Sequence, residues 1–294
     1  MRSIRAILAA TDFSAGATHA ARRAAMLAAE YDARLILLHV VEPDALLAVR
    51  DWLARGRELR AALEEQARLQ LEAQARRLEQ DHGVRVERLL RVGRPLEEVH
   101  EASIATDLMV LGACGEPGAL EAALGTLADR LVRTAERPAL VVNRAPERAY
   151  ARALVLTDFS GAAQAALRAA LGVARQGSVH LLHAYSIPFE GKLRLASVSD
   201  NDIAAYRREV RDGAYGRMQQ MLADVDAPDR TQSVVVPGDI RREALRASER
   251  MQADLVAVGK QGESLLEDML LGSTTSHMLA HAGCDVLVVP RRAG

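Results

Sequence analysis

Cysteine, aromatic residues and net charge are all scarce in this sequence. The 294 residues include 2 cysteines and 3% aromatic residues, and the formal net charge is -1. Two cysteines cannot build the disulfide framework of a small secreted domain, so a reducing compartment is the simpler expectation. Without a basic balance or many aromatic rings, the chain lacks the features of a general nucleic-acid binder.

Long apolar runs are missing from the sequence as well. No run approaches the roughly 20 residues that a membrane-spanning helix needs. The first residues are typical of a strand and not of a signal peptide. We therefore expect a cytoplasmic protein that binds neither nucleic acid nor membrane.

What the sequence does contain is one unusual glycine pattern that occurs twice. It reads Gly112-Ala-Cys-Gly115 followed by Gly125-Thr126, and again Gly259-Lys-Gln-Gly262 followed by Gly272-Ser273-Thr274. Glycines let a backbone turn tightly and approach a ligand closely. A hydroxyl residue after the last glycine can open a helix whose free N–H groups face an anion. The pattern predicts phosphate binding in duplicate.

The duplication extends along the whole chain at an offset of about 146 residues. Thr11-Asp-Phe-Ser14 recurs as Thr157-Asp-Phe-Ser160, and Leu37-Leu-His39 recurs as Leu181-Leu-His183. A period this long indicates repeated domains and not a solenoid. We predict two domains, residues 1–146 and 147–294.

Within each half, short apolar runs alternate with helical patterns. Runs such as Leu35–Val41 are almost continuously apolar, as expected of strands that are buried on both faces. The alternation predicts a parallel sheet with helices on both faces. Ligands of such sheets bind at the carboxyl ends of strands, near the topological switch point. The linker between the halves has no Gly/Ser-rich tether, so we expect the halves to pack together.

These residues resemble the universal stress protein family in its tandem two-domain form. The glycine pattern, the Asp-Phe-Ser turn and the Leu-Leu-His strand end carry the resemblance, which covers essentially the whole chain. It implies a Rossmann-like α/β fold with, in each domain, a five-stranded parallel sheet of order 3-2-1-4-5 flanked by helices. It also implies that the fifth strands, at residues 139–143 and 285–290, pair in an internal pseudo-dimer; a homodimer of two chains stays open.

Many members of this family bind ATP, and the resemblance carries their site to both halves. It implies that Asp12 and Asp158 lie beside the adenosine and that the backbone of Val40 or Ala184 meets the adenine edge. In the first half the residues expected to line the phosphates are Gly112, Gly115, Gly125 and Thr126. In the second half they are Gly259, Gly262, Gly272, Ser273 and Thr274. Magnesium bound with the ATP is compatible with this site.

The two copies depart from the family pattern to different extents. The first half has Cys114 and Glu116 in its loop and Leu127 where a small or hydroxyl residue is usual. The second half has Glu263 but keeps Lys260 and Thr274. The second site is therefore nearer the family pattern.

Several of these residues also have simpler interpretations. The aspartates can cap the helices that follow them, and His39 and His183 are expected to be structural residues at strand ends. His277, His281 and Cys284 have a spacing that can bind zinc, but no fourth ligand is evident. Cys114 is interpreted as a small turn residue in preference to a redox thiol.

The function favoured by this evidence is that of an ATP-binding sensor or regulatory module in the stress response. The alternative is an interaction scaffold of the same fold with degenerate nucleotide sites. We do not expect an enzyme, because the loops show no Walker sequence and no arginine finger; slow ATP hydrolysis is a third, less favoured alternative.

Overall fold

The computed structural model describes residues 4–42, 56–113, 126–187, 196, 198–225, 227–262 and 271–291. The strands of the first half are β1 (Ala6–Ala10), β2 (Arg34–Val41), β3 (Val86–Val92), β4 (Leu108–Gly112) and β5 (Ala139–Val142). Those of the second half are β6 (Arg152–Leu156), β7 (Ser178–Tyr185), β8 (Thr231–Pro237), β9 (Leu255–Gly259) and β10 (Asp285–Val289).

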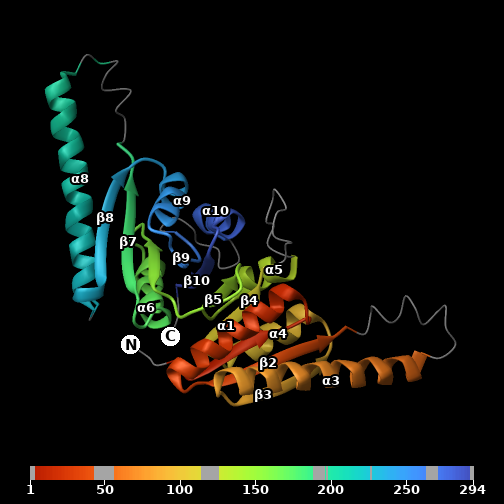
Figure 1. Ribbon diagram of the computed structural model, residues 1–294. Coiled ribbons are helices and arrows are strands. Elements are labelled where there is room, and N and C mark those ends of the chain that lie inside the picture. The colour runs from red at the N-terminus through yellow and green to blue at the C-terminus, as the bar shows by residue number, and fades with distance from the viewer. Residues whose placement is uncertain are drawn as a thin grey trace.

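All these strands form one sheet of order β3-β2-β1-β4-β5-β10-β9-β6-β7-β8 (Figure 1). The order 3-2-1-4-5 expected for each half is confirmed in both. Within each half every pairing is parallel.

The two halves join where β5 pairs with β10, and this pairing is antiparallel. Leu140 lies opposite Leu287, and Val141 lies opposite Val286. All four side chains are fully buried. The pairing continues the sheet from one half into the other, so the internal pseudo-dimer is present as expected.

Helices cover both faces of the sheet, because side chains alternate along each strand. One face packs against α1 (Ala15–Tyr31), α3 (Gly56–His82), α6 (Gly161–Val173) and α8 (Asp200–Ala223). The other packs against α4 (Pro95–Ile104), α5 (Thr126–Thr134), α9 (Ile240–Arg250) and α10 (Ser273–His281). A short 3-10 helix, η1 (Pro228–Arg230), precedes β8. Equivalent helices of the two halves lie on the same face, and each core runs unbroken across the β5–β10 junction.

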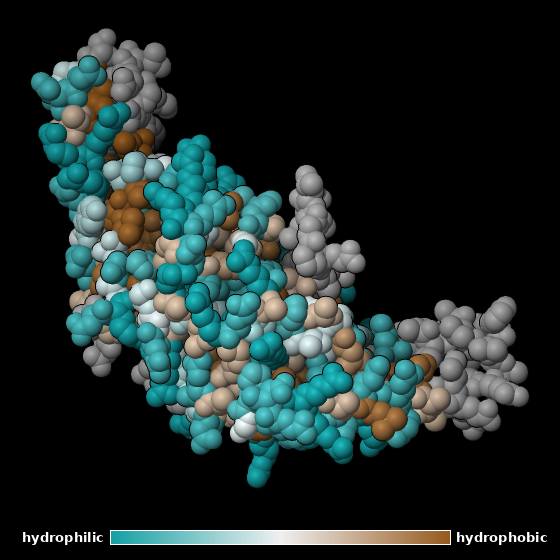
Figure 2. Space-filling model, viewed as in Figure 1, coloured by the Kyte–Doolittle hydropathy of each residue, from teal (hydrophilic) through white to brown (hydrophobic). Residues whose placement is uncertain are grey.

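Most of the face seen in Figure 2 is hydrophilic, and hydrophobic residues gather on it mainly beside α8. None of the helices in the described part of the chain is both long and apolar enough to span a bilayer.

A buried polar cluster also fastens the halves together. Arg23 on α1 lies with its guanidinium 4.0 Å from the ring centre of Tyr150 and donates through Nη1 to the carbonyl of Arg148 (2.7 Å). The hydroxyl of Tyr150 donates to Oδ2 of Asp285 at 2.5 Å, and the backbone N–H of Asn143 donates to Oδ1 of the same residue at 2.9 Å. The linker is thus held against elements of both halves, which agrees with the expected packing.

We predict that Leu287→Ala destabilises the whole chain and not its second half alone. Removing a fully buried leucine side chain costs about 2–5 kcal/mol, and Leu287 belongs to a core that both halves share. Urea unfolding followed by circular dichroism should show one transition at lower urea. As a control, Leu69→Ala, at a side chain that is 63% exposed, should change the unfolding free energy by less than about 0.5 kcal/mol. Two separate transitions, with only one shifted, would contradict a shared core.

Candidate functional sites

Each half has a hollow at the carboxyl ends of its first and fourth strands. The first hollow, of about 150 Å³, adjoins β1 and β4, and the second, of about 210 Å³, adjoins β6 and β9. These strands are neighbours in the sheet, and the chain leaves them toward opposite faces, as at a topological switch point. Because β5 and β10 are antiparallel, the strands of the two halves end on opposite sides of the sheet, and the two hollows open on those opposite sides.

The second hollow brings together every site residue predicted for the second half. They come from the end of β6, the end of β7, the loop after β9 and the start of α10, and are Asp158, Ala184, Gly259, Gly262, Gly272, Ser273 and Thr274. Sequence reasoning did not include Ile240 on α9, Gln261 or Thr275, which also line the hollow.

The Thr-Asp-Phe-Ser turn positions the aspartate of the second hollow. The hydroxyl of Thr157 accepts the N–H of Phe159 at 2.8 Å, and Oδ1 of Asp158 accepts the N–H of Ser160 at 2.9 Å. Ser160 then caps α6, its hydroxyl accepting the N–H of Ala163 at 3.2 Å. Asp158 therefore stabilises the turn before the helix, and the serine is the cap. The other carboxylate oxygen of Asp158, Oδ2, lies 3.0 Å from where a Cβ on Gly262 would be, so the carboxylate borders the glycine loop.

The same turn occurs at the first hollow with the same hydrogen bonds. Thr11 accepts from Phe13 at 3.1 Å, and Asp12 accepts from Ser14 at 3.0 Å. Phe13 and Phe159 both have positive φ, 65° and 67°. This left-handed conformation is uncommon for a bulky residue and marks a strained turn. No signal in the sequence indicated that these phenylalanines adopt a positive φ.

The strand-end histidines help to hold these strained phenylalanines. The rings of His39 and Phe13 lie 4.4 Å apart between centres, and those of His183 and Phe159 lie 4.3 Å apart. Nδ1 of His183 lies 2.8 Å from the carbonyl oxygen of Thr157. Burial is the main cause that lowers the pKa of His183, so its ring is neutral at pH 7. These contacts fit the structural role expected of both histidines.

The glycines of the pattern act in two different ways. A Cβ on Gly259 would lie 2.9 Å from Cβ of Ala162, and one on Gly112 would lie 2.7 Å from the backbone nitrogen of Ala17. These two glycines therefore let the fourth strand pack closely against the start of α6 or α1. Gly272 is the N-cap of α10, with φ of -59°, and a Cβ there would have its nearest neighbour at 3.5 Å, so neither backbone conformation nor packing within the described residues requires glycine.

The start of α10 offers backbone donors to the second hollow. Its N-cap residue, Gly272, has no side chain to cap the helix, and Ser273, Thr274 and Thr275 all line the hollow. The first N–H groups of a helix have no partner within it, and the helix dipole favours a negative charge there. This end of the hollow is suited to an anion.

Lys260 lies within the glycine pattern, but its side chain does not line the second hollow. Its side chain is buried, with 6% exposed, and Nζ donates to the carbonyl of Ala135 in the first half at 3.1 Å. The residue following β9 therefore ties the second loop to the end of α5. Contact with the first half therefore accounts for the direction of this side chain.

Three of the residues predicted for the first site lie in the described part of the first hollow. Asp12, Val40 and Gly112 line it. Gly115 and Gly125 lie outside the described residues, as do Cys114 and Glu116, while Thr126 begins α5 and its side chain is not described. The remaining lining is mostly apolar and includes Pro95, Val99, Leu127 and Leu131. This apolar lining suits a triphosphate less well than the hydroxyl groups and backbone donors of the second hollow do.

The histidine pair considered for zinc lies on α10. The rings of His277 and His281 are 4.5 Å apart between centres, and burial lowers the pKa of His277. Among the described residues, no group of three His, Cys, Asp or Glu side chains is arranged to hold a metal ion. Cys284 instead lies buried before β10, where burial raises the pKa of its thiol to about 12.

The sheet order and the paired hollows define a tandem, doubly wound α/β protein. The sequence model of the universal stress protein family matches residues 3–143 and again residues 149–290. The chain therefore belongs to the universal stress protein family, whose members serve in the stress response.

The relatives include proteins that match the whole chain and proteins that match about half of it. A universal stress protein of Mycolicibacterium smegmatis is 28% identical over 297 residues, which cover 97% of each chain. One from Synechocystis is 26% identical over 153 residues, 48% of this chain and 97% of that protein. A crystal structure of a universal stress protein from Archaeoglobus fulgidus matches 99% of this chain and 100% of its own with a TM-score of 0.71, at 20% identity. That likeness supports the fold.

We predict that Gly259→Ala destabilises the protein by about 1–3 kcal/mol, the usual cost of overpacking. The added methyl group would meet the backbone carbonyl carbon of Ala162 at 3.0 Å. Gly213→Ala is the matched control, because Gly213 lies within α8 with no atom within 4 Å of its Cβ position. That change should stabilise the helix by about 0.5–1 kcal/mol. Thermal unfolding of both variants measures this, and equal effects would overturn the packing role.

Proposed function

We propose that this protein is a regulatory module that binds ATP in its second hollow. The observation that carries the proposal is the convergence of seven predicted residues, from four separate segments, on that one hollow. A binding site built from segments so distant in sequence is not expected from turn formation alone. Membership of the universal stress protein family agrees with this role.

The geometry suggests how the nucleotide lies. The adenine would meet the backbone at Ala184, at the end of β7, and the ribose would lie beside Asp158. The phosphates would then lie near Gly262 and the start of α10, where Ser273 and Thr274 add hydroxyl groups. This places the carboxylate of Asp158 at the sugar and away from the most negative part of the ligand.

The phosphates would be held mainly by neutral donors. Lys260 is turned toward Ala135, and His183 is the one basic side chain among the described residues that line the hollow. Backbone N–H groups at a helix start are suited to this task. Magnesium bound with the ATP would neutralise further charge, since Mg²⁺ usually binds substrate phosphates through few protein ligands.

We predict that Gly262→Val weakens ATP binding at least tenfold, about 1.4 kcal/mol. A Cβ at this position would lie 3.0 Å from Oδ2 of Asp158, so a branched side chain would fill the space between the carboxylate and the loop. Gly115→Val is the matched change in the first half and should leave the affinity within about twofold. Isothermal titration calorimetry of the full chain measures both.

Thermal unfolding must show that both variants are folded. Unchanged affinity in Gly262→Val, or loss only in Gly115→Val, would contradict binding in the second hollow. Unchanged affinity in both variants, or no ATP binding by the wild type, would favour the alternative of an interaction scaffold with degenerate sites.

We also predict that ATP turnover is far below the roughly 1–100 per second typical of kinases. Phosphoryl transfer needs a positioned nucleophile and cationic stabilisation of the transferred group. Among the described residues, no lysine or arginine lines the second hollow, and Asp158 would lie at the sugar. A phosphate-release assay with Mg²⁺ or Mn²⁺ tests this. Turnover of several per second, abolished by Ser273→Ala, would show that the protein is an enzyme.

A further inference from the structure

A hollow larger than both nucleotide-type sites lies away from them. It has a volume of about 690 Å³ and is formed by the segment after β5, the starts of β6 and β10, and the segment that joins α9 to β9. We call it the linker cavity. It opens at the amino ends of β6, β9 and β10, the opposite ends from those that form the second hollow. Its volume lies within the range of about 300–1,000 Å³ typical of small-molecule sites.

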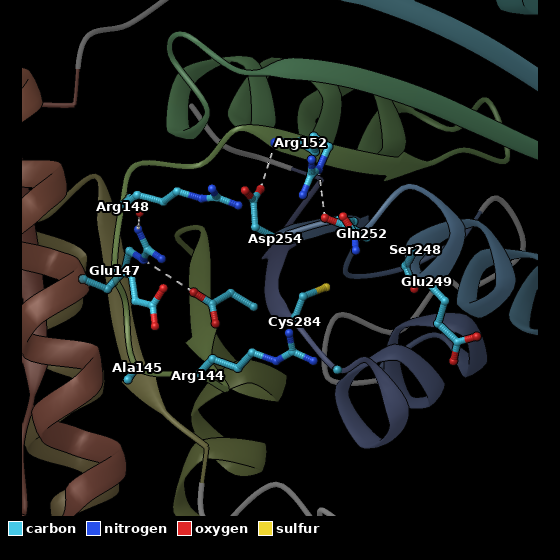
Figure 3. A pocket seen from close by; sticks show the side chains of 14 residues that line it. Arg144, Ala145, Glu147, Arg148, Arg152, Ser248, Glu249, Gln252, Asp254 and Cys284 are labelled. Carbon is cyan, nitrogen blue, oxygen red and sulfur yellow. Dashed lines mark hydrogen bonds and ion pairs between the residues drawn. The ribbon is translucent and has the colours of Figure 1, made fainter.

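Arginines dominate the cationic lining of the linker cavity. Arg144 and Arg148 extend from the segment after β5 toward Cys284 and Asp254 (Figure 3). Among the described residues, neither guanidinium has a hydrogen bond or ion pair that would occupy it. Arg152 borders the same hollow and donates through Nε to the carbonyl of Gln252 at 3.0 Å.

A fourth arginine, Arg23, lines the cavity from the buried side. It is 6% exposed. Its Nε lies 3.5 Å from Oδ2 of Asp285 but makes no hydrogen bond with any described residue. Asp285, the carbonyl of Arg148 and the ring of Tyr150 hold this guanidinium, so it contributes positive charge at the buried side of the cavity.

The two carboxylates near these arginines, the half-buried Asp254 and the buried Asp285, already have partners. Asp254 accepts the backbone N–H groups of Ala151 and Arg152 at 2.8 and 2.9 Å. Asp285 accepts the hydroxyl of Tyr150 and the N–H of Asn143. Glu147 and Glu249, the other two acidic residues of the lining, are exposed to solvent. The arginines at the mouth are therefore not neutralised by direct contact with these acids.

The duplication supplies an internal comparison for this lining. Asp107 accepts the N–H of Ala6 just as Asp254 accepts that of Arg152, so Ala6 is the counterpart of Arg152. Arg23 and Ala169 follow the capping serines of α1 and α6 at equal distances, so alanine is also the counterpart of Arg23. Arg23 and Arg152 thus have no arginine counterparts, whereas Arg144 corresponds to Arg291, because Val142 and Val289 have the same register beside the fourth strands.

We propose that the linker cavity binds a small phosphate-bearing anion through Arg144 and Arg148. The planar guanidinium fork matches the oxygens of a phosphate group bidentately. Two such forks at the mouth of one hollow, with Arg152 and the buried Arg23 beside them, form a site for a ligand with at least two negative charges. Since both halves line the cavity, occupancy would bear on their relative position. This inference does not depend on ATP binding in the second hollow.

Isothermal titration calorimetry of the full chain with inorganic pyrophosphate, at about 0.15 M salt to screen weak surface attraction, tests the proposal. The double variant Arg144→Gln/Arg148→Gln should bind pyrophosphate at least tenfold more weakly than the wild type. Arg22→Gln/Arg77→Gln is the control, because it removes the same charge from exposed positions on α1 and α3. It should bind as the wild type does, and so should Gly262→Val.

Citrate, an anion of similar charge without phosphate, should bind at least tenfold more weakly than pyrophosphate. Equal citrate binding would overturn the assignment to phosphate. Failure of the wild type to bind pyrophosphate, or equal losses in both arginine double variants, would overturn the site. Loss in Gly262→Val alone would place the pyrophosphate in the second hollow and would likewise overturn it.

Discussion

The antiparallel pairing of β5 with β10 is the constraint on which the rest of the structure depends. It removes one of the two edges that each half would otherwise expose and joins two five-stranded sheets into one. Because of this pairing, the two nucleotide-type hollows lie at opposite ends of the strands, and the linker cavity lies at the junction. The buried Arg23–Tyr150–Asp285 cluster and the contact between Lys260 and Ala135 reinforce that junction.

Duplication has given the chain two sites of one design and different chemistry. Both keep the strained phenylalanine turn, the stacked histidine and the close-packed glycine after the fourth strand. The first hollow combines this frame with Leu127 and other apolar side chains, whereas the second combines it with hydroxyl groups at an uncapped helix start. The shared frame is therefore a property of the fold, and the differing side chains decide what each hollow can bind.

Much of this arrangement could be predicted from the sequence. Alternating patterns and the family resemblance gave the sheet order, and the glycine pattern gave the lining of the second hollow. The direction of Lys260 could not be predicted, because it depends on where α5 of the other half ends. The left-handed Phe13 and Phe159 escaped prediction because phenylalanine gives no signal for positive φ. The linker cavity combines residues from five segments that share no motif.

The most direct test of this account is the number and position of ATP molecules bound by the full chain. Native mass spectrometry with Mg²⁺ and ATP, at concentrations near the measured Kd, counts them. The account predicts that at most one ATP binds to the wild type and to Gly115→Val, with similar occupancy, and that the occupancy of Gly262→Val is several-fold lower. Two ATP molecules on the wild type, or one still bound to Gly262→Val and lost from Gly115→Val, would contradict the assignment of the nucleotide to the second hollow.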